Sequence, residues 1–288
     1  MKFEKWQALG NDYLILERER LPWELTAGRV EWLCDQHFGV GSDGVLLLSK
    51  SEDPEFVADL RIFNPDGSEA ELSGNGAREA ILYLRRNGWT DADEFAIGTV
   101  AGPIRPTITG ELTCSVDMGR ASTASKDFPS GGEDGRGTLQ AAGREWEFQH
   151  VSIGNPQCAI VVGEELDELD LGEIGPGIEG HELFPNRTNV SFLAIDGSRV
   201  RARIFERGVG ETLSSGTGAS GAAVTAFLRG APSPLVVELE GGELQVEISE
   251  DLDVRLDGWA EPVFRGELSP ELLEALAELD GAPGDADE

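Results

Sequence analysis

Two serines, Ser73 and Ser215, each begin a Ser-Gly-x-Gly-Ala segment that runs into an apolar stretch. This pattern predicts the start of a helix, where the first backbone N–H groups have no acceptor within the helix. Such a start favours the binding of an anion. The serine itself is a favoured helix N-cap. Its hydroxyl is a weak acid–base group, because a helix dipole contributes at most about 2 kcal/mol and an alcohol ionises well above a thiol.

The two serine segments belong to an internal repeat. Residues 61–80 and 203–222 are identical at nine of twenty positions, at an offset of 142 residues. Upstream, Leu9-Gly10-Asn11-Asp12 is answered by Ile153-Gly154-Asn155-Pro156 at an offset of 144. Two copies of half the chain's length indicate two similar domains, since a solenoid needs several short units. We therefore expect one domain over 1–118, completed by 263–288, a second over 119–262, and two helix starts that face a shared cleft.

Strands dominate the expected secondary structure, and helices are few. The helix after Ser73 ends at Asn87-Gly88, and the helix after Ser215 ends at Arg229-Gly230. The second of these is apolar almost all round over 221–228, which predicts a buried central helix wrapped by strands. The remaining expectations are strands over 3–17, 44–48 and 60–63, a turn over 64–68, a helix over 22–37, a loop over 130–137, a helix from Ser269-Pro270 and a tail over 281–288.

Acidic residues greatly outnumber basic ones in this chain. There are 54 Asp and Glu against 23 Lys and Arg, which gives a formal net charge of −31. Such an excess opposes binding to nucleic acid and to anionic membranes. Disorder does not explain it, because the charges are spread along a chain with 40% hydrophobic residues. A halophilic cytoplasm does, since molar salt shortens the Debye length to about 3 Å and screens the self-repulsion.

The sequence gives no sign of a bound cofactor or metal. Cys34, Cys114 and Cys158 lack metal-ligand spacing and suit a reducing cytoplasm. The segment 39–44 matches the glycine pattern of dinucleotide sites, but it precedes a strand and is therefore interpreted as a turn. No apolar run has the length of a signal peptide core or a membrane span. We expect a cytoplasmic protein whose partner is a small molecule; a homodimer is left open.

Five sequence blocks together resemble one known family, the diaminopimelate epimerases, along nearly the whole chain. The first and third of them contain the asparagines of the upstream echo, and the second and fifth contain the serine segments. The blocks are Leu9-Gly10-Asn11-Asp12, residues 61–68 with 73–78, Gly154-Asn155-Pro156, Arg187-Thr188-Asn189, and residues 206–212 with 215–219.

This resemblance implies a fold and a reaction. The fold is α+β, with two pseudo-symmetric domains, each a curled, mainly antiparallel sheet around a central buried helix. The reaction is a cofactor-independent epimerisation of LL- and meso-diaminopimelate in lysine biosynthesis, in which one group removes the Cα proton and another delivers a proton to the opposite face. No pyridoxal phosphate is used. The substrate contacts that it implies are Asn11, Asn64, Gly74, Asn75, Asn155, Asn189, Glu206, Arg207, Gly216 and Thr217.

The chain departs from the family at its acid–base pair. The resemblance places two catalytic cysteines at the positions of Ser73 and Ser215, and a histidine often stands where this chain has Gln157. Three hypotheses follow: a diaminopimelate epimerase, an isomerase or dehydratase of the same fold that uses Glu206 or Glu69 as a carboxylate base, and a non-catalytic amino-acid binder. The segment Glu206-Arg207 and both glycine anion sites favour the first.

Overall fold

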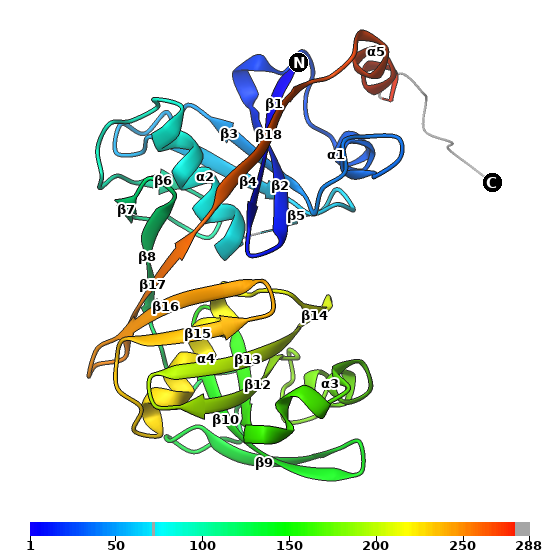
Figure 1. The fold of residues 1–288 in the computed structure, drawn as a ribbon. Helices are drawn as coiled ribbons and strands as arrows, with labels where there is room; N and C mark the ends of the chain where they lie inside the picture. Colours follow the sequence, from blue (N-terminus) through cyan, green and yellow to red (C-terminus); the bar gives the residue numbers. More distant parts are fainter. Residues whose placement is uncertain (71–72, 280–288) are drawn as a thin grey trace, which may run out of the picture. The chain divides into compact units, whose positions relative to one another are not determined.

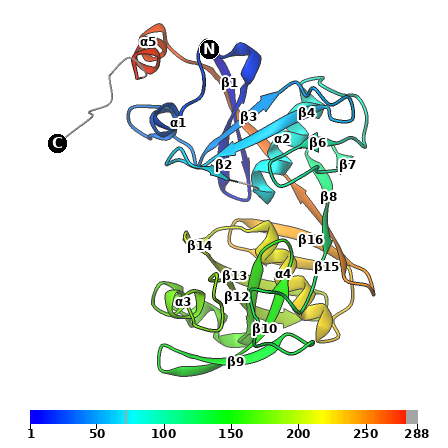
Figure 2. The ribbon, with the colours of Figure 1, turned by 180° about the vertical axis from the view of Figure 1, so that it is seen from behind.

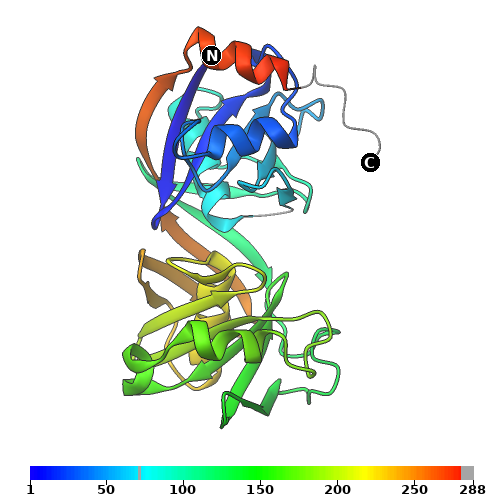
Figure 3. The ribbon, with the colours of Figure 1, turned by 90° about the vertical axis from the view of Figure 1, so that its right-hand side faces the viewer.

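A computed structural model describes residues 1–70 and 73–279 of the chain. The chain divides into two compact units, of which unit 1 comprises Met1–Cys114 with Trp259–Glu288 and unit 2 comprises Ser115–Gly258. Within the described residues, both units are rich in strands and contain few helices (Figures 1, 2 and 3). The predicted α+β class is therefore confirmed. The tail predicted over 281–288 lies outside the described residues.

Unit 1 is built on a sheet that joins the two ends of the described chain. Its strands follow the order β18-β1-β2-β3-β4-β5, with β6 beside β4. The pairs β2/β3 and β4/β6 are parallel, and the other pairs are antiparallel. The elements are β1 (Lys2–Ala8), β2 (Asn11–Glu17), η1 (Arg18–Arg20), α1 (Ala27–Cys34), β3 (Val45–Ser49), β4 (Ala58–Phe63), β5 (Glu69–Ala70), α2 (Gly74–Arg86), β6 (Ile97–Gly98), β7 (Pro106–Gly110), β18 (Glu261–Glu267) and α5 (Pro270–Glu278).

Helix α2 lies against strands β1, β2 and β3, and it is buried on almost every side from Asn75 to Leu84. On the other face of the sheet, Leu14 and Leu16 pack with Val30 and Leu33 of α1 and Leu276 of α5. The alternation of side chains along β2 thus supplies two separate cores, because successive residues point to opposite faces.

Unit 2 contains the second large sheet. Its strand order is β8-β17-β16-β15-β13-β12-β11-β10-β9, with β7 next to β8 and β14 next to β13. Helix α4 contacts strands β10 to β13 and β15 and β16, and its residues are buried nearly all round, as its apolar sequence predicts. The elements are β8 (Thr113–Arg120), β9 (Arg136–Ala141), β10 (Arg144–Ser152), β11 (Pro156–Val161), η2 (Gly163–Glu168), α3 (Leu171–Glu179), β12 (Asn189–Asp196), β13 (Arg199–Glu206), β14 (Gly210–Thr212), α4 (Gly216–Leu228), β15 (Leu235–Leu239), β16 (Gly242–Ile248) and β17 (Asp253–Trp259).

Three local expectations need correction. The strand expected over 3–17 is a hairpin, because Leu9 and Gly10 have φ values of 53° and 81° and form a two-residue turn. The helix expected over 22–37 is confined to α1. Helix α3 was not expected, because its sequence contains Gly172, Gly175, Pro176 and Gly177. Within the described part of the chain, no helix is long and apolar enough to cross a membrane.

Candidate active site

Ser73 and Ser215 occupy the same place in the two units, directly before α2 and α4. The Oγ of Ser73 accepts a hydrogen bond from the N–H of Gly76 at 3.1 Å, and the Oγ of Ser215 accepts one from Gly218 at 3.2 Å. Both serines are therefore helix N-caps, as predicted. Each cap leaves the first N–H groups of its helix outside the intrahelical pattern, where they suit a carboxylate.

A tyrosine stands behind the serine of unit 1. The hydroxyl of Tyr13, on β2, donates a hydrogen bond to the Oγ of Ser73 at 3.2 Å. The Tyr13 side chain is buried, whereas Ser73 is partly exposed. Ser73 thus receives two hydrogen bonds, and no described residue accepts its own proton. No sequence pattern points to Tyr13, since an aromatic residue inside a strand is ordinarily part of the core.

Two predicted asparagines meet beside the start of α2. The Nδ2 of Asn75 approaches the Oδ1 of Asn11 at 3.4 Å, and the Oδ1 of Asn75 accepts a hydrogen bond from Arg78. The Nδ2 of Asn11 donates to Asp43 at 3.0 Å. Asn64 lies elsewhere, in the turn before β5, where its Nδ2 donates to the Oγ of Ser68 at 3.0 Å. No described hydrogen bond joins Asn64 to the other predicted residues.

A charged group that the sequence did not indicate supports Asn11. The Nζ of Lys5 lies 2.6 Å from the Oδ2 of Asp12, and the backbone N–H of Asp12 donates to Asp43 at 3.0 Å. Burial raises the pKa of Asp12, the hydrogen bond from Lys5 opposes this, and the charge of Asp43 adds to it. The positive charge of Lys5 therefore offsets the repulsion between Asp12 and Asp43. Its Nζ also donates a hydrogen bond to the carbonyl of Gly41 at 2.8 Å.

A carboxylate stands behind the serine of unit 2. The hydroxyl of Ser215 donates to the Oε2 of Glu206 at 2.9 Å, and the hydroxyl of Thr212 donates to the Oε1 at 2.9 Å. Burial raises the pKa of Glu206, and these two hydrogen bonds oppose the rise. A carboxyl group with a raised pKa in contact with a hydroxyl is suited to exchange a proton with it.

Glu69, the other carboxylate considered from the sequence, has different surroundings. It is exposed and forms a two-point ion pair with Arg61, at 2.8 Å for both contacts. The hydrogen bond from Arg61 lowers the pKa of Glu69. The repeat places Arg203 with Glu211 in the same way, at 2.7 Å. These two pairs therefore connect neighbouring strands, β4 with β5 and β13 with β14.

The backbone after β13 is held by residues from three segments. The N–H of Arg207 donates to the Oδ1 of Asn189 at 2.9 Å, and the guanidinium of Arg207 donates to the carbonyl of Asn186 at 3.0 Å. The N–H of Gly208 donates to the buried carboxylate of Glu179 at 2.7 Å. Sequence reasoning missed Glu179, because it ends α3, a helix that was not expected and that carries no motif.

Asn155 and Thr217 are brought together at the start of α4. The Nδ2 of Asn155 donates to the Oγ1 of Thr217 at 3.1 Å, and its Oδ1 accepts from the Nε2 of Gln157 at 2.7 Å. Gly216, between the cap and Thr217, is buried. Both ends of the Asn155 amide are thus fixed, so its orientation is set before any ligand arrives.

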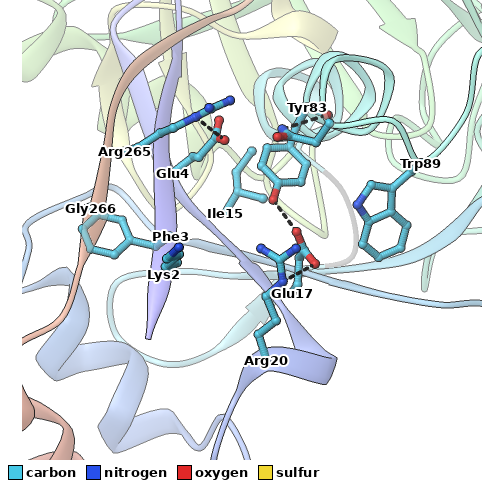
Figure 4. Close-up of a pocket in the computed structure, with 11 residues that line it drawn as sticks. Lys2, Phe3, Glu4, Ile15, Glu17, Arg20, Tyr83, Trp89, Arg265 and Gly266 are labelled. Carbon is cyan, nitrogen blue, oxygen red and sulfur yellow. Dashed lines mark hydrogen bonds and ion pairs between the residues drawn. The ribbon is translucent and has the colours of Figure 1, made fainter.

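A separate pocket of about 280 Å³ lies in unit 1 against β1 and β18 (Figure 4). Both of its carboxylates are paired: Glu17 accepts a hydrogen bond from Tyr83 at 2.7 Å and contacts Arg20 at 2.9 Å, while Glu4 contacts Arg265 at 2.7 Å. None of the predicted site residues lines this pocket.

Comparison with known proteins adds the family. The sequence profile described as diaminopimelate epimerase matches residues 3–124 and 149–258. The chain is 39% identical to diaminopimelate epimerase 2 of Nostoc sp. over 279 residues, which is 95% of this chain and 97% of that protein. It is 39% identical to the diaminopimelate epimerase of Pelotomaculum thermopropionicum over 278 residues, 93% of this chain and 98% of that protein.

Solved structures show a common fold at low sequence identity. A predicted epimerase from Pseudomonas aeruginosa aligns with a TM-score of 0.62 at 18% identity, covering 93% of this chain and 98% of that one. A hydroxyproline epimerase from Agrobacterium vitis aligns with a TM-score of 0.62 at 16% identity, covering 93% of this chain and 90% of that one. At these identities, the likeness shows the fold alone.

Proposed function

The chain belongs to the diaminopimelate epimerase family, a family of isomerases, and from that premise we propose that it inverts one Cα centre of diaminopimelate. The reaction interconverts the LL and meso forms without a cofactor and serves lysine biosynthesis in the cytoplasm. The observation that carries the proposal is the family match over both serine-capped helix starts, at 39% identity to proteins that are named for this activity.

Each unit supplies one hydroxyl to the reacting carbon in this proposal, Ser73 from unit 1 and Ser215 from unit 2. The N–H groups at the starts of α2 and α4 hold the α-carboxylate and stabilise the carbanion. The other substrate contacts are the predicted set, which is Asn11, Asn64, Gly74, Asn75, Asn155, Asn189, Glu206, Arg207, Gly216 and Thr217.

The base is proposed to be a carboxylate. The 2.9 Å hydrogen bond from Ser215 to Glu206 supports this role, because an alcohol alone has no usable basic form near neutral pH. Glu69 is not supported, since its carboxylate is held by Arg61. Glu206 can then accept the proton that Ser215 passes on from Cα, in addition to its place among the substrate contacts.

The test is to incubate the full chain with LL-diaminopimelate in deuterium oxide at molar potassium chloride. We expect deuterium to enter at Cα and the meso form to accumulate, measured by proton NMR and by chiral chromatography. Lysine and proline serve as substrate controls. Absence of both exchange and inversion with diaminopimelate, with binding retained in calorimetry, would replace this function by a non-catalytic amino-acid binder.

A further inference from the structure

The two serines have opposite hydrogen-bond roles toward their neighbours. Ser215 gives its proton to a carboxylate, Glu206, at 2.9 Å. Ser73 instead receives the proton of a phenol, Tyr13, at 3.2 Å. Both serines accept one backbone N–H from their helices, so the difference lies entirely in the side chain behind each serine. The internal repeat does not extend to these partners.

A phenol and a carboxylate suit opposite halves of a proton transfer. A carboxylate accepts protons, whereas a phenol is a stronger acid than an alcohol and can supply one. Ser215 contacts a proton acceptor, the carboxylate of Glu206, and Ser73 contacts a proton donor, the phenol of Tyr13. Among the described residues, none accepts the proton of the Ser73 hydroxyl.

We propose that Tyr13 is the positioning residue that makes Ser73 the proton-delivering side of the site, while Glu206 makes Ser215 the proton-removing side. This inference rests on the proposed function and deepens it. The paired hydroxyls are then not equivalent, and each antipode presents its Cα proton to a different one of them.

The proton transfers balance without any other reactant. On one face, the Cα–H bond breaks, the proton passes to the Oγ of Ser215, and the Ser215 proton passes to Glu206. On the other face, the Oγ–H bond of Ser73 breaks to form the new Cα–H bond, and Tyr13 returns a proton to Ser73. The enzyme is left with a protonated Glu206 and a Tyr13 phenolate, and proton exchange with water restores both.

The test compares Tyr13→Phe with Tyr83→Phe, which removes the hydroxyl of the only other tyrosine in the chain. For Tyr13→Phe, we expect inversion to fall about 100-fold, as for the loss of a positioned proton donor. Glu206 remains, so deuterium should still enter at Cα with retained configuration in the antipode whose proton faces Ser215. The ratio of exchange to inversion should therefore rise for that antipode. Tyr83→Phe should leave both rates unchanged, because its hydroxyl bonds only Glu17 among the described residues.

A merely structural role of Tyr13 predicts a proportional loss of exchange and inversion, and that result would overturn the inference. So would a Tyr13→Phe variant that inverts the substrate as fast as the unaltered chain does. If Tyr13→Phe does not fold, as judged by its melting temperature, Ser73→Ala must show the same raised ratio of exchange to inversion, and failure to do so counts against the inference. Failure of the unaltered chain to act on diaminopimelate refutes the proposed function instead.

Discussion

A serine can take part in proton transfer at Cα only with help, because its hydroxyl ionises well above a thiol. In the proposed mechanism, that help comes in unit 2 from Glu206, a partly buried carboxylate that accepts hydrogen bonds from both Ser215 and Thr212. Burial raises the pKa of the Glu206 carboxyl, and the hydrogen bonds from the two hydroxyls stabilise its ionised form. The chemistry of this residue is therefore set by the two hydroxyl groups that it contacts and by its burial.

Replacement of Glu206 by Gln separates its catalytic role from its effect on stability. We expect inversion to fall by about 100-fold or more, because the proton acceptor is lost. The raised pKa of Glu206 means that its contribution to stability is present at low pH and is lost as the pH rises through the raised value. Gln stays neutral, so the urea midpoint of the variant should gain on that of the unaltered chain as the pH rises from the ordinary pKa of a glutamate to the raised pKa of Glu206, and the difference should be constant above it.

The matched control for that experiment is Glu211→Gln. Glu211 is exposed and pairs with Arg203, so its loss should change the free energy of unfolding by at most about 1 kcal/mol. Inversion should stay within about twofold of the unaltered rate. Equal inversion by Glu206→Gln and the unaltered chain would exclude Glu206 as the base.

Restoring thiols tests the serine pair itself. The double replacement Ser73→Cys with Ser215→Cys should raise turnover by orders of magnitude, because a thiol ionises near neutral pH at a helix start. Either replacement alone should help little, since inversion needs a partner on each face. The measurement is steady-state inversion of diaminopimelate. An unchanged rate in the double variant would show that the thiol position does not limit the reaction.

At the scale of elements, the packing of α4 against β11 depends on a missing side chain. A Cβ on Gly221 would lie 2.8 Å from the Cγ and 3.0 Å from the Cβ of Gln157. Gln157 in turn holds Asn155, which holds Thr217 at the helix start. Close approach of the helix to the strand thus sets the geometry of a predicted substrate contact.

Gly221→Ala should therefore disturb both stability and the site. We expect a loss of about 1–3 kcal/mol in the free energy of unfolding, from overpacking against Gln157. Gly28→Ala is the control, because Gly28 lies in α1 with nothing within 4 Å of the added Cβ. That change should raise stability by up to about 1 kcal/mol through helix propensity. The measurement is the free energy of unfolding in urea for both variants. Equal changes for Gly221→Ala and Gly28→Ala would contradict the close packing of α4 on β11.

The sequence predicts elements well where composition and packing agree. Helices α2 and α4 follow from their glycine-rich starts, serine caps and apolar bodies. Helix α3 could not be predicted, because it contains three glycines and Pro176 and is held by packing of Leu171 and Ile178 into a core with distant strands. The division into similar domains over 1–118, completed by 263–288, and 119–262 stays a prediction.

In the candidate site, too, the local interactions could be predicted from the sequence and the long-range ones could not. The sequence pattern gives Ser73 and Ser215 as caps, because capping is a local interaction. Tyr13 and Glu179 act over long sequence separations, at 60 residues from Ser73 and 29 from Gly208. Their roles follow from strand register and from a helix end, neither of which the pattern of residue types encodes. The assignment of the substrate contacts stays a prediction.

At the scale of the whole molecule, the net charge of −31 governs the response to salt. Some of the few Lys and Arg side chains already form surface ion pairs, such as Arg144–Glu165 and Arg201–Asp167. The remaining acidic groups repel one another, and that repulsion is screened when the Debye length falls to about 3 Å at molar salt. The melting temperature should therefore rise steeply from dilute buffer to molar potassium chloride. A melting temperature that does not change with salt would remove the basis for the halophilic prediction.

The discontinuity of unit 1 has a consequence for synthesis on the ribosome. Strand β1 pairs with β18, and Lys2 lies opposite Glu267, so all of Ser115–Gly258 is synthesised before the partner of β1 is made. Unit 2 is contiguous and can complete its sheet first, although it comes second in the chain. Until β18 is made, β1 pairs only with β2, and its other edge is open and can template aggregation. A nascent chain that stalls before Glu261 should therefore depend on a chaperone, whereas synthesis through Glu267 lets β18 close the sheet that β1 began.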